Sequence, residues 1–142
     1  MKSIISKTMM LVAIGATLLS FSPKPGGEGF EISLNNKVLI QRYGNDINTV
    51  NSLQLNQSAA SDQLIIKYHH CGKVGKNRIV AIKDGQNNVL KEFRYADVST
   101  PVAAMSLPVK DILSLRKGNA NSLKLYYTSS ELPNGRVLAN IN

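Results

Sequence analysis

Residues 78–95 read RIVAIKDGQNNVLKEFRY, and this stretch decides the fold class. Its first part, 78–84, and its last part, 89–95, are rich in β-branched and aromatic residues, which fit the pleated surface of a strand. Between them lies DGQNN at 84–88, and Gly and Asn are the residues that adopt the positive φ angles of tight turns. Two strand patterns around such a turn predict an antiparallel hairpin.

Alternating apolar and polar residues predict further short strands on both sides of this hairpin. The clearest is 63–70, in which every second residue from Leu64 to His70 lies on one face, because successive side chains of a strand point to opposite sides. The other strands are expected at 30–34, 37–43, 53–55, 123–127 and 136–141. One short helix is expected at 108–117, where Pro108 suits a first helical turn and Gly118 follows as a stop.

Short strands at this spacing predict an all-β protein, an antiparallel β-sandwich of jelly-roll or Greek-key type with one short helix. A parallel α/β sheet would need a helix between successive strands, and the pattern offers one helix. No internal repeat is evident in the sequence. The sandwich is expected to form a single domain over residues 30–142, since a chain of this length can bury one core.

The N-terminal segment has the order of an export signal. Lys2 and Lys7 come first, and residues 9–19 are then apolar or small throughout, a stretch shorter than the roughly 20 apolar residues that span a membrane. We therefore expect a signal peptide at 1–22 and a flexible Pro/Gly-rich leader at 23–29. A buried core helix is the alternative interpretation of the apolar stretch.

These features predict a secreted or periplasmic product with no stable membrane span once the signal is removed. No Cys lies near the end of the apolar stretch, so a lipid-anchored form is not expected. The chain of 142 residues carries 17 Lys and Arg against 9 Asp and Glu. Because the basic residues are spread along the chain rather than clustered, we interpret them as a solvated surface and expect no nucleic-acid partner.

The densest group of potential metal ligands is His69-His70-Cys71, which holds both histidines and the one cysteine of the chain. On a strand, His69 and Cys71 would point to the same side, as two ligands of a copper or zinc ion would. Further ligands would have to come from Met105 or from a carboxylate such as Asp97. The alternatives are a hydrogen-bonded core histidine at His70 and a buried, inert thiol.

The second candidate is the loop at 72–78, GKVGKNR, which joins two strands. Its glycine amides and its three basic side chains, Lys73, Lys76 and Arg78, are suited to holding an anion or contacting a partner. The glycine spacing differs from that of the nucleotide-binding motif. A solvated basic loop is the alternative.

Two tyrosines, Tyr43 and Tyr126, lie on strand faces opposite to their apolar neighbours and are the candidates for an exposed ring that stacks on a sugar or a base. The absence of Trp weakens that interpretation.

For catalysis, a hydrolase would have to combine Cys71 with His69 as its base, and no orienting carboxylate is apparent in the sequence. We therefore expect no enzymatic activity.

The stretch KYHHCGKVGKNRIVAIKDGQNNVLKEFRYAD at 67–97, together with LKLYY at 123–127, resembles a group of small exported β-proteins of Bacteroidota-type bacteria. The resemblance implies a periplasmic or secreted setting, and it implies no activity, cofactor or site. The expected function is a non-enzymatic binding or structural module of the cell envelope or periplasm, with an envelope or extracellular protein or glycan as partner and no cofactor. The alternative is a periplasmic protein that binds copper or zinc through His69, His70 and Cys71.

Overall fold

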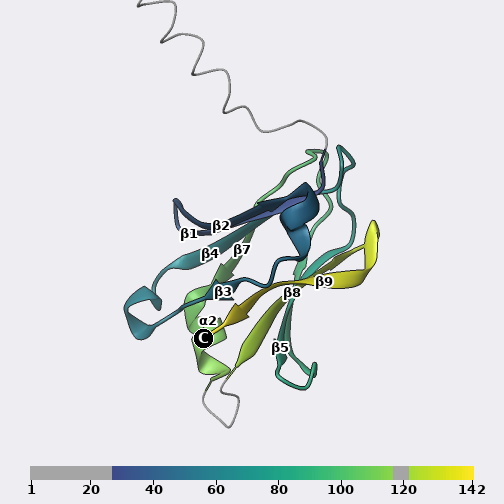
Figure 1. Ribbon diagram of the computed structural model, residues 1–142. Helices are drawn as coiled ribbons and strands as arrows, with labels where there is room; N and C mark the ends of the chain where they lie inside the picture. Colours follow the sequence, from purple (N-terminus) through teal and green to yellow (C-terminus); the bar gives the residue numbers. More distant parts are fainter. Residues whose placement is uncertain (1–26, 117–121) are drawn as a thin grey trace, which may run out of the picture.

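The computed structural model describes residues 27–116 and 122–142, and it shows two sheets packed face to face (Figure 1). Sheet A has the order β2 (Lys37–Tyr43), β1 (Gly29–Leu34), β4 (Gln63–His69), β7 (Met105–Pro108). Sheet B has the order β3 (Ser52–Leu53), β9 (Leu132–Ile141), β8 (Leu123–Ser129), β5 (Arg78–Asp84), β6 (Val89–Tyr95). Neighbouring strands are antiparallel except for β3 and β9. The expected all-β sandwich with one short helix is confirmed, while the expected signal peptide at 1–22 lies outside the described residues.

The predicted hairpin at 78–95 is formed by β5 and β6. Its turn is held by the carboxylate of Asp84, whose Oδ1 accepts hydrogen bonds from the backbone N–H of Gln86 and of Asn88, both at 2.9 Å. Ile82 pairs with Lys91 and Lys83 pairs with Val89, so Leu90 is left over as a β-bulge. The sequence pattern therefore located the hairpin, and the bulge is an addition that the pattern did not show.

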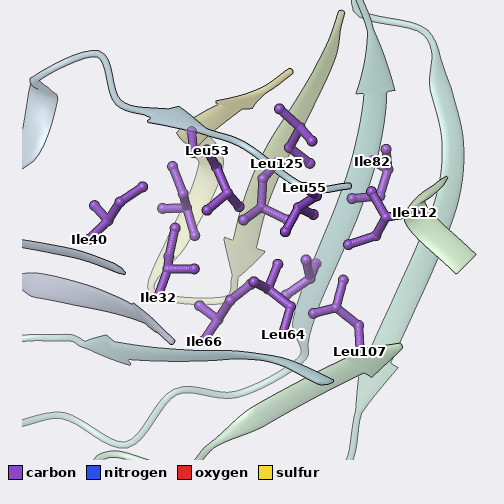
Figure 2. Packing of buried hydrophobic residues seen from close by; sticks show 14 of the residues in the cluster. Ile32, Ile40, Leu53, Leu55, Leu64, Ile66, Ile82, Leu107, Ile112 and Leu125 are labelled. Carbon is purple, nitrogen blue, oxygen red and sulfur yellow. The ribbon is translucent and has the colours of Figure 1, made fainter. Parts of the chain in front are cut away.

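The core lies between the sheets and follows the predicted alternation. On β4, Leu64 and Ile66 are fully buried, and on β8 so are Leu123 and Leu125. Figure 2 shows apolar side chains from sheet A, such as Ile32 and Ile66, pointing towards those of sheet B, such as Leu125 and Ile82. Because burial of apolar area is the dominant favourable term in folding, this alternation fixes which face of each strand turns inward.

The helix is shorter than expected, since α2 spans Val109–Ser114 rather than 108–117. Pro108 still ends strand β7 and occupies the N-cap position. At the other end, the Arg116 guanidinium donates hydrogen bonds to the backbone carbonyls of Leu55 and Asn142. The expected stop at Gly118 lies outside the described residues. No helix in the described part of the chain is long and apolar enough to cross a membrane.

The strand order repeats within the chain, which the sequence analysis missed. In the first half, β1 and β2 form a hairpin in sheet A, β3 crosses to sheet B, and β4 returns beside β1. In the second half, β5 and β6 form a hairpin in sheet B, β7 crosses to sheet A, and β8 returns beside β5. Both hairpins carry a bulge, at Leu39 and at Leu90. The returning strands bring Tyr68 and Tyr127 together as a stacked pair, with ring centroids 4.5 Å apart. Each half thus resembles a Greek key whose third strand lies in the opposite sheet.

Candidate functional site

The three residues His69, His70 and Cys71 diverge at the end of β4. His69 is the last residue of that strand, and its ring meets the ring of Tyr43 edge-on, with centroids 5.8 Å apart. His70 is buried with 7% of its surface exposed, whereas the Cys71 thiol is exposed. The expectation that His69 and Cys71 share one side of a strand does not hold, because the strand ends before Cys71.

Cys71 lies in a tight turn with an unusual backbone conformation. Its φ angle is 54° and that of Gly72 is 83°, and the N–H of Lys73 donates to the carbonyl oxygen of His70 at 3.1 Å. Two successive positive φ angles define a type I′ turn, in which Asn and Gly are favoured at the first of these positions. A cysteine there is strained, since the left-handed conformation costs an L-residue roughly 1–2 kcal/mol.

Replacing Cys71 with Asn is therefore expected to raise the free energy of unfolding by about 0.5–1 kcal/mol. Urea unfolding under reducing conditions measures this change. Cys71→Ala is the matched control, because alanine removes the thiol and keeps the unfavourable φ angle. An equal effect of Asn and Ala would contradict the turn assignment.

The structure offers no complete ligand set for copper or zinc. Within residues 27–116 and 122–142, no three His, Cys, Asp or Glu side chains are grouped so that they could hold a metal ion. Met105 is fully buried in the core. Asp97 accepts a hydrogen bond from the backbone N–H of Asn77 at 2.9 Å. The additional ligands that the sequence analysis considered are thus occupied elsewhere in the fold.

His70 is part of a buried aromatic cluster between the two sheets. Its Nε2 lies 2.7 Å from the hydroxyl oxygen of Tyr127 and 3.4 Å from that of Ser129, and its ring centroid is 4.7 Å from that of Tyr68. Burial lowers the pKa of His70 and raises the pKa of Tyr127 to about 12. The imidazole is therefore neutral at pH 7, and the Tyr127 hydroxyl keeps its proton.

The protonation of His70 predicts how stability depends on pH. Its pKa is lowered in the folded state chiefly by burial, and also by Arg78 and His69, against the opposing charges of Glu131 and Glu28. In the unfolded chain the pKa returns to about 6.5. As the pH is lowered, the unfolded state therefore binds the proton before the folded state does. The free energy of unfolding then falls below about pH 6.5, by up to roughly 1.4 kcal/mol per pH unit.

Urea unfolding between about pH 5.5 and 7.5 tests this dependence around the unfolded histidine pKa. His70→Gln removes the titrating group and is expected to flatten the decline. A slope that survives His70→Gln would contradict the assignment.

The three basic residues of the loop at 72–78 are not brought together. Arg78 is buried, and its guanidinium donates to the backbone carbonyls of Ala96 and Ala103, each at 3.1 Å. Lys76 is exposed, and its backbone N–H donates to a carboxylate oxygen of Glu131 at 3.0 Å. Arg78 therefore stabilises the segment that leads into β7. An anion at this loop would contact Lys73 and Lys76 without Arg78.

Three of the candidate residues do share a pocket at the end of the sandwich. The pocket has a volume of about 270 Å³. It is lined by Glu28, His70, Cys71, Lys73, Glu131 and Leu132. The two glutamates are residues that the sequence analysis missed, because they come from distant segments and carry no motif.

The two tyrosines proposed as surface rings differ in what covers them. The Lys83 ammonium nitrogen lies 3.5 Å from the centroid of the Tyr126 ring, and a Cβ at Gly135 would come within 2.5 Å of a carbon of that ring. Tyr43 lies over Gly29, where a Cβ would be 2.0 Å from the ring carbon Cδ1. Its ring therefore covers the backbone of β1 on the outer face of sheet A, and it is half-buried. A glycine in a strand is a signal of such close approach, and sequence reasoning missed it.

A row of polar side chains lies next to the Tyr43 ring on the outer face of sheet A. The register places Tyr43, Gly29 and His69 side by side across strands β2, β1 and β4, and the next outward-facing row holds Gln41, Glu31 and Lys67. The Gln41 amide nitrogen donates to Glu31 and to the Tyr43 hydroxyl, both at 3.2 Å. The outer face of sheet A thus combines an aromatic corner with hydrogen-bonding side chains, all on rigid strands.

A scan against models of protein families finds no match to this chain, and a search of the curated proteins finds none either. The resemblance to small exported proteins therefore stays a prediction, and function has to be argued from the geometry.

Proposed function

We propose that the protein is an exported, non-enzymatic binding module of the cell envelope or periplasm, and that it holds a pyranose-containing glycan against the outer face of sheet A. The observation that carries the proposal is the Tyr43 ring lying over Gly29 with His69 at its edge. We call this pair of rings the Tyr43–His69 corner.

A pyranose ring suits this corner because one of its faces is rich in C–H groups and its rim carries hydroxyls. The C–H face packs on an aromatic ring, which offers a large apolar surface with few rotatable bonds. The hydroxyls need planar or charged side chains beside the ring, and Gln41, Glu31 and Lys67 lie in the neighbouring row. This combination of an apolar platform with a few polar groups is typical of small-ligand sites.

The corner is also fixed before a ligand arrives. Tyr43 is held by Gln41 at its hydroxyl and by Gly29 beneath its ring. Binding then costs little side-chain entropy, because the contacting groups are already ordered. The same argument disfavours Tyr126 as a platform, since Lys83 lies over one face of its ring.

The non-enzymatic part of the proposal rests on His70. Its Nε2 is engaged by Tyr127 inside the core, whereas a general base must reach the proton that it removes. The His69 ring lies against Tyr43 on the outer face of sheet A, whereas Cys71 belongs to the turn that follows β4. The fold therefore supports recognition better than it supports covalent chemistry.

An array of neutral and acidic pyranose glycans, including purified envelope polysaccharides, tests the proposal with the purified protein. We expect saturable binding that Tyr43→Leu weakens at least about tenfold, because leucine covers Gly29 but offers no ring face. Tyr126→Leu makes the same change on the outer face of sheet B and should leave binding unchanged. No bound glycan, or an equal loss in both variants, would overturn the proposal.

A further inference from the structure

The pocket at the end of the sandwich is lined by neither Tyr43 nor His69, and it brings together three segments distant in sequence. Glu28 precedes β1, Cys71 and Lys73 belong to the turn after β4, and Glu131 and Leu132 come from the β8–β9 hairpin. Its volume of about 270 Å³ corresponds to roughly nine water molecules at about 30 Å³ each. A small organic molecule of amino-acid size fits that space.

Two carboxylates on opposite segments give the pocket its acidic character, and the fold holds both in place. One oxygen of Glu28 accepts from the Tyr68 hydroxyl at 2.5 Å and lies 3.4 Å from the Arg136 guanidinium. One oxygen of Glu131 accepts from the backbone N–H of Lys76 at 3.0 Å. Fixed carboxylates on one pocket are complementary to an ammonium group.

The buried wall of the pocket is His70, whose ring can offer a hydrogen bond to a ligand. The Tyr127 hydroxyl oxygen lies 2.7 Å from His70 Nε2, and the Ser129 hydroxyl oxygen lies 3.4 Å from the same nitrogen. In the tautomer in which Tyr127 donates to Nε2, the neutral ring carries its own proton on Nδ1. Both hydrogen-bond partners of the ring among the described residues are at Nε2.

We infer that this pocket binds a small zwitterion, an α-amino acid with an apolar side chain. The ammonium group lies between Glu28 and Glu131, the carboxylate accepts from His70 Nδ1 and pairs with Lys73, and the side chain packs on Leu132. The charges of the ligand are complementary to those of the pocket wall, where two carboxylates and a lysine lie together. Among the described residues, no three His, Cys, Asp or Glu side chains are grouped to hold a metal ion, and Lys73 would repel one in this pocket.

The test is an NMR titration of the purified protein with three matched probes: L-leucine, 3-methylbutylamine, which lacks the carboxylate, and 4-methylpentanoate, which lacks the ammonium group. We expect L-leucine to shift the backbone amides of Gly72, Lys73 and Leu132 saturably, with a Kd on the order of 1–10 mM. Each half-probe should bind at least about fivefold more weakly, because it leaves one set of charged groups without a partner.

Variants separate this site from the rest of the surface. Glu131→Gln should weaken L-leucine binding at least about fivefold, since it removes a charged partner of the ammonium group. Glu92→Gln changes an exposed glutamate on β6 that pairs with Arg94 and should have no effect. Absence of saturable shifts, equal binding of the amine alone, or unchanged binding by Glu131→Gln would overturn the inference. None of these outcomes bears on glycan binding at the Tyr43–His69 corner.

Discussion

Replacing Tyr127, the largest fully buried side chain in the described part of the chain, with Ala is expected to lower the free energy of unfolding by about 3–5 kcal/mol. Tyr127 is fully buried, and its ring stacks on that of Tyr68 with centroids 4.5 Å apart and an angle of 22° between the planes. The truncation would leave a cavity between the two sheets and would remove the hydrogen bond to His70 Nε2. Urea unfolding measures the loss.

Tyr127→Phe separates packing from hydrogen bonding. It keeps the ring and removes the hydroxyl, so His70 Nε2 is left with Ser129 Oγ at 3.4 Å. We expect a loss of about 1–2 kcal/mol, the cost of one buried hydrogen bond. If Phe cost as much as Ala, the stack between Tyr68 and Tyr127 would contribute little, and the account of the core at this point would be wrong.

Replacing Gly29 with Ala is expected to abolish glycan binding and to cost about 1–3 kcal/mol of stability, because the added methyl group overlaps a packed ring. A Cβ at this position would lie 2.0 Å from Tyr43 Cδ1 and 2.8 Å from the backbone oxygen of Arg42. The tyrosine would have to leave the surface of β1, and the Tyr43–His69 corner would be lost with it. Glycan affinity and urea unfolding are both measured on the same variant.

Gly27→Ala is the matched control for this substitution. A Cβ at Gly27 meets nothing within 4 Å, so both affinity and stability should stay at the values of the unchanged protein. Retention of full glycan binding by Gly29→Ala would show that the position of Tyr43 does not matter for recognition.

The alternation of residues predicted the strands and the inward faces well, for a physical reason. On β4 and β8 every second side chain is apolar, and burying one face of a strand fixes the phase of the whole strand. That argument places Leu64, Tyr68 and His70 inward, and these residues are buried. It also fixes the hairpin at 78–95, because the strands and their turn are adjacent in sequence.

The arrangement of the candidate site depended on features that alternation does not encode. A strand pattern says nothing about where the strand stops, so Cys71 was expected to follow the phase of His69 although it lies in a turn with φ 54°. The burial of Arg78 depends on carbonyl groups of Ala96 and Ala103, which belong to an irregular segment. Contacts of this kind arise from the tertiary fold and leave no periodic signal in the sequence.

The long-range pairings were equally hidden. The repeat of hairpin, crossing strand and returning strand depends on which strands become neighbours, for example β4 beside β1 and β8 beside β5. A resemblance between the halves survives in short stretches only, such as NNKVLIQRY at 35–43 and NNVLKEFRY at 87–95. Tyr43 and Tyr95 end these stretches, yet Tyr43 covers Gly29 on the outer face while the Tyr95 hydroxyl donates to the backbone oxygen of Ser106 at 2.9 Å.

The central claim is that recognition takes place on the outer face of sheet A, and mapping the backbone amides by NMR during titration with a glycan bound on the array tests it most directly. The account predicts that the largest shifts fall on Gly29, Gln41, Lys67 and His69, and that they saturate together. It also predicts that Tyr43→Leu lowers the affinity measured from these shifts at least about tenfold, while Tyr126→Leu leaves it unchanged. Shifts confined to sheet B or to the β8–β9 hairpin, with the outer face of sheet A unchanged, would contradict the account.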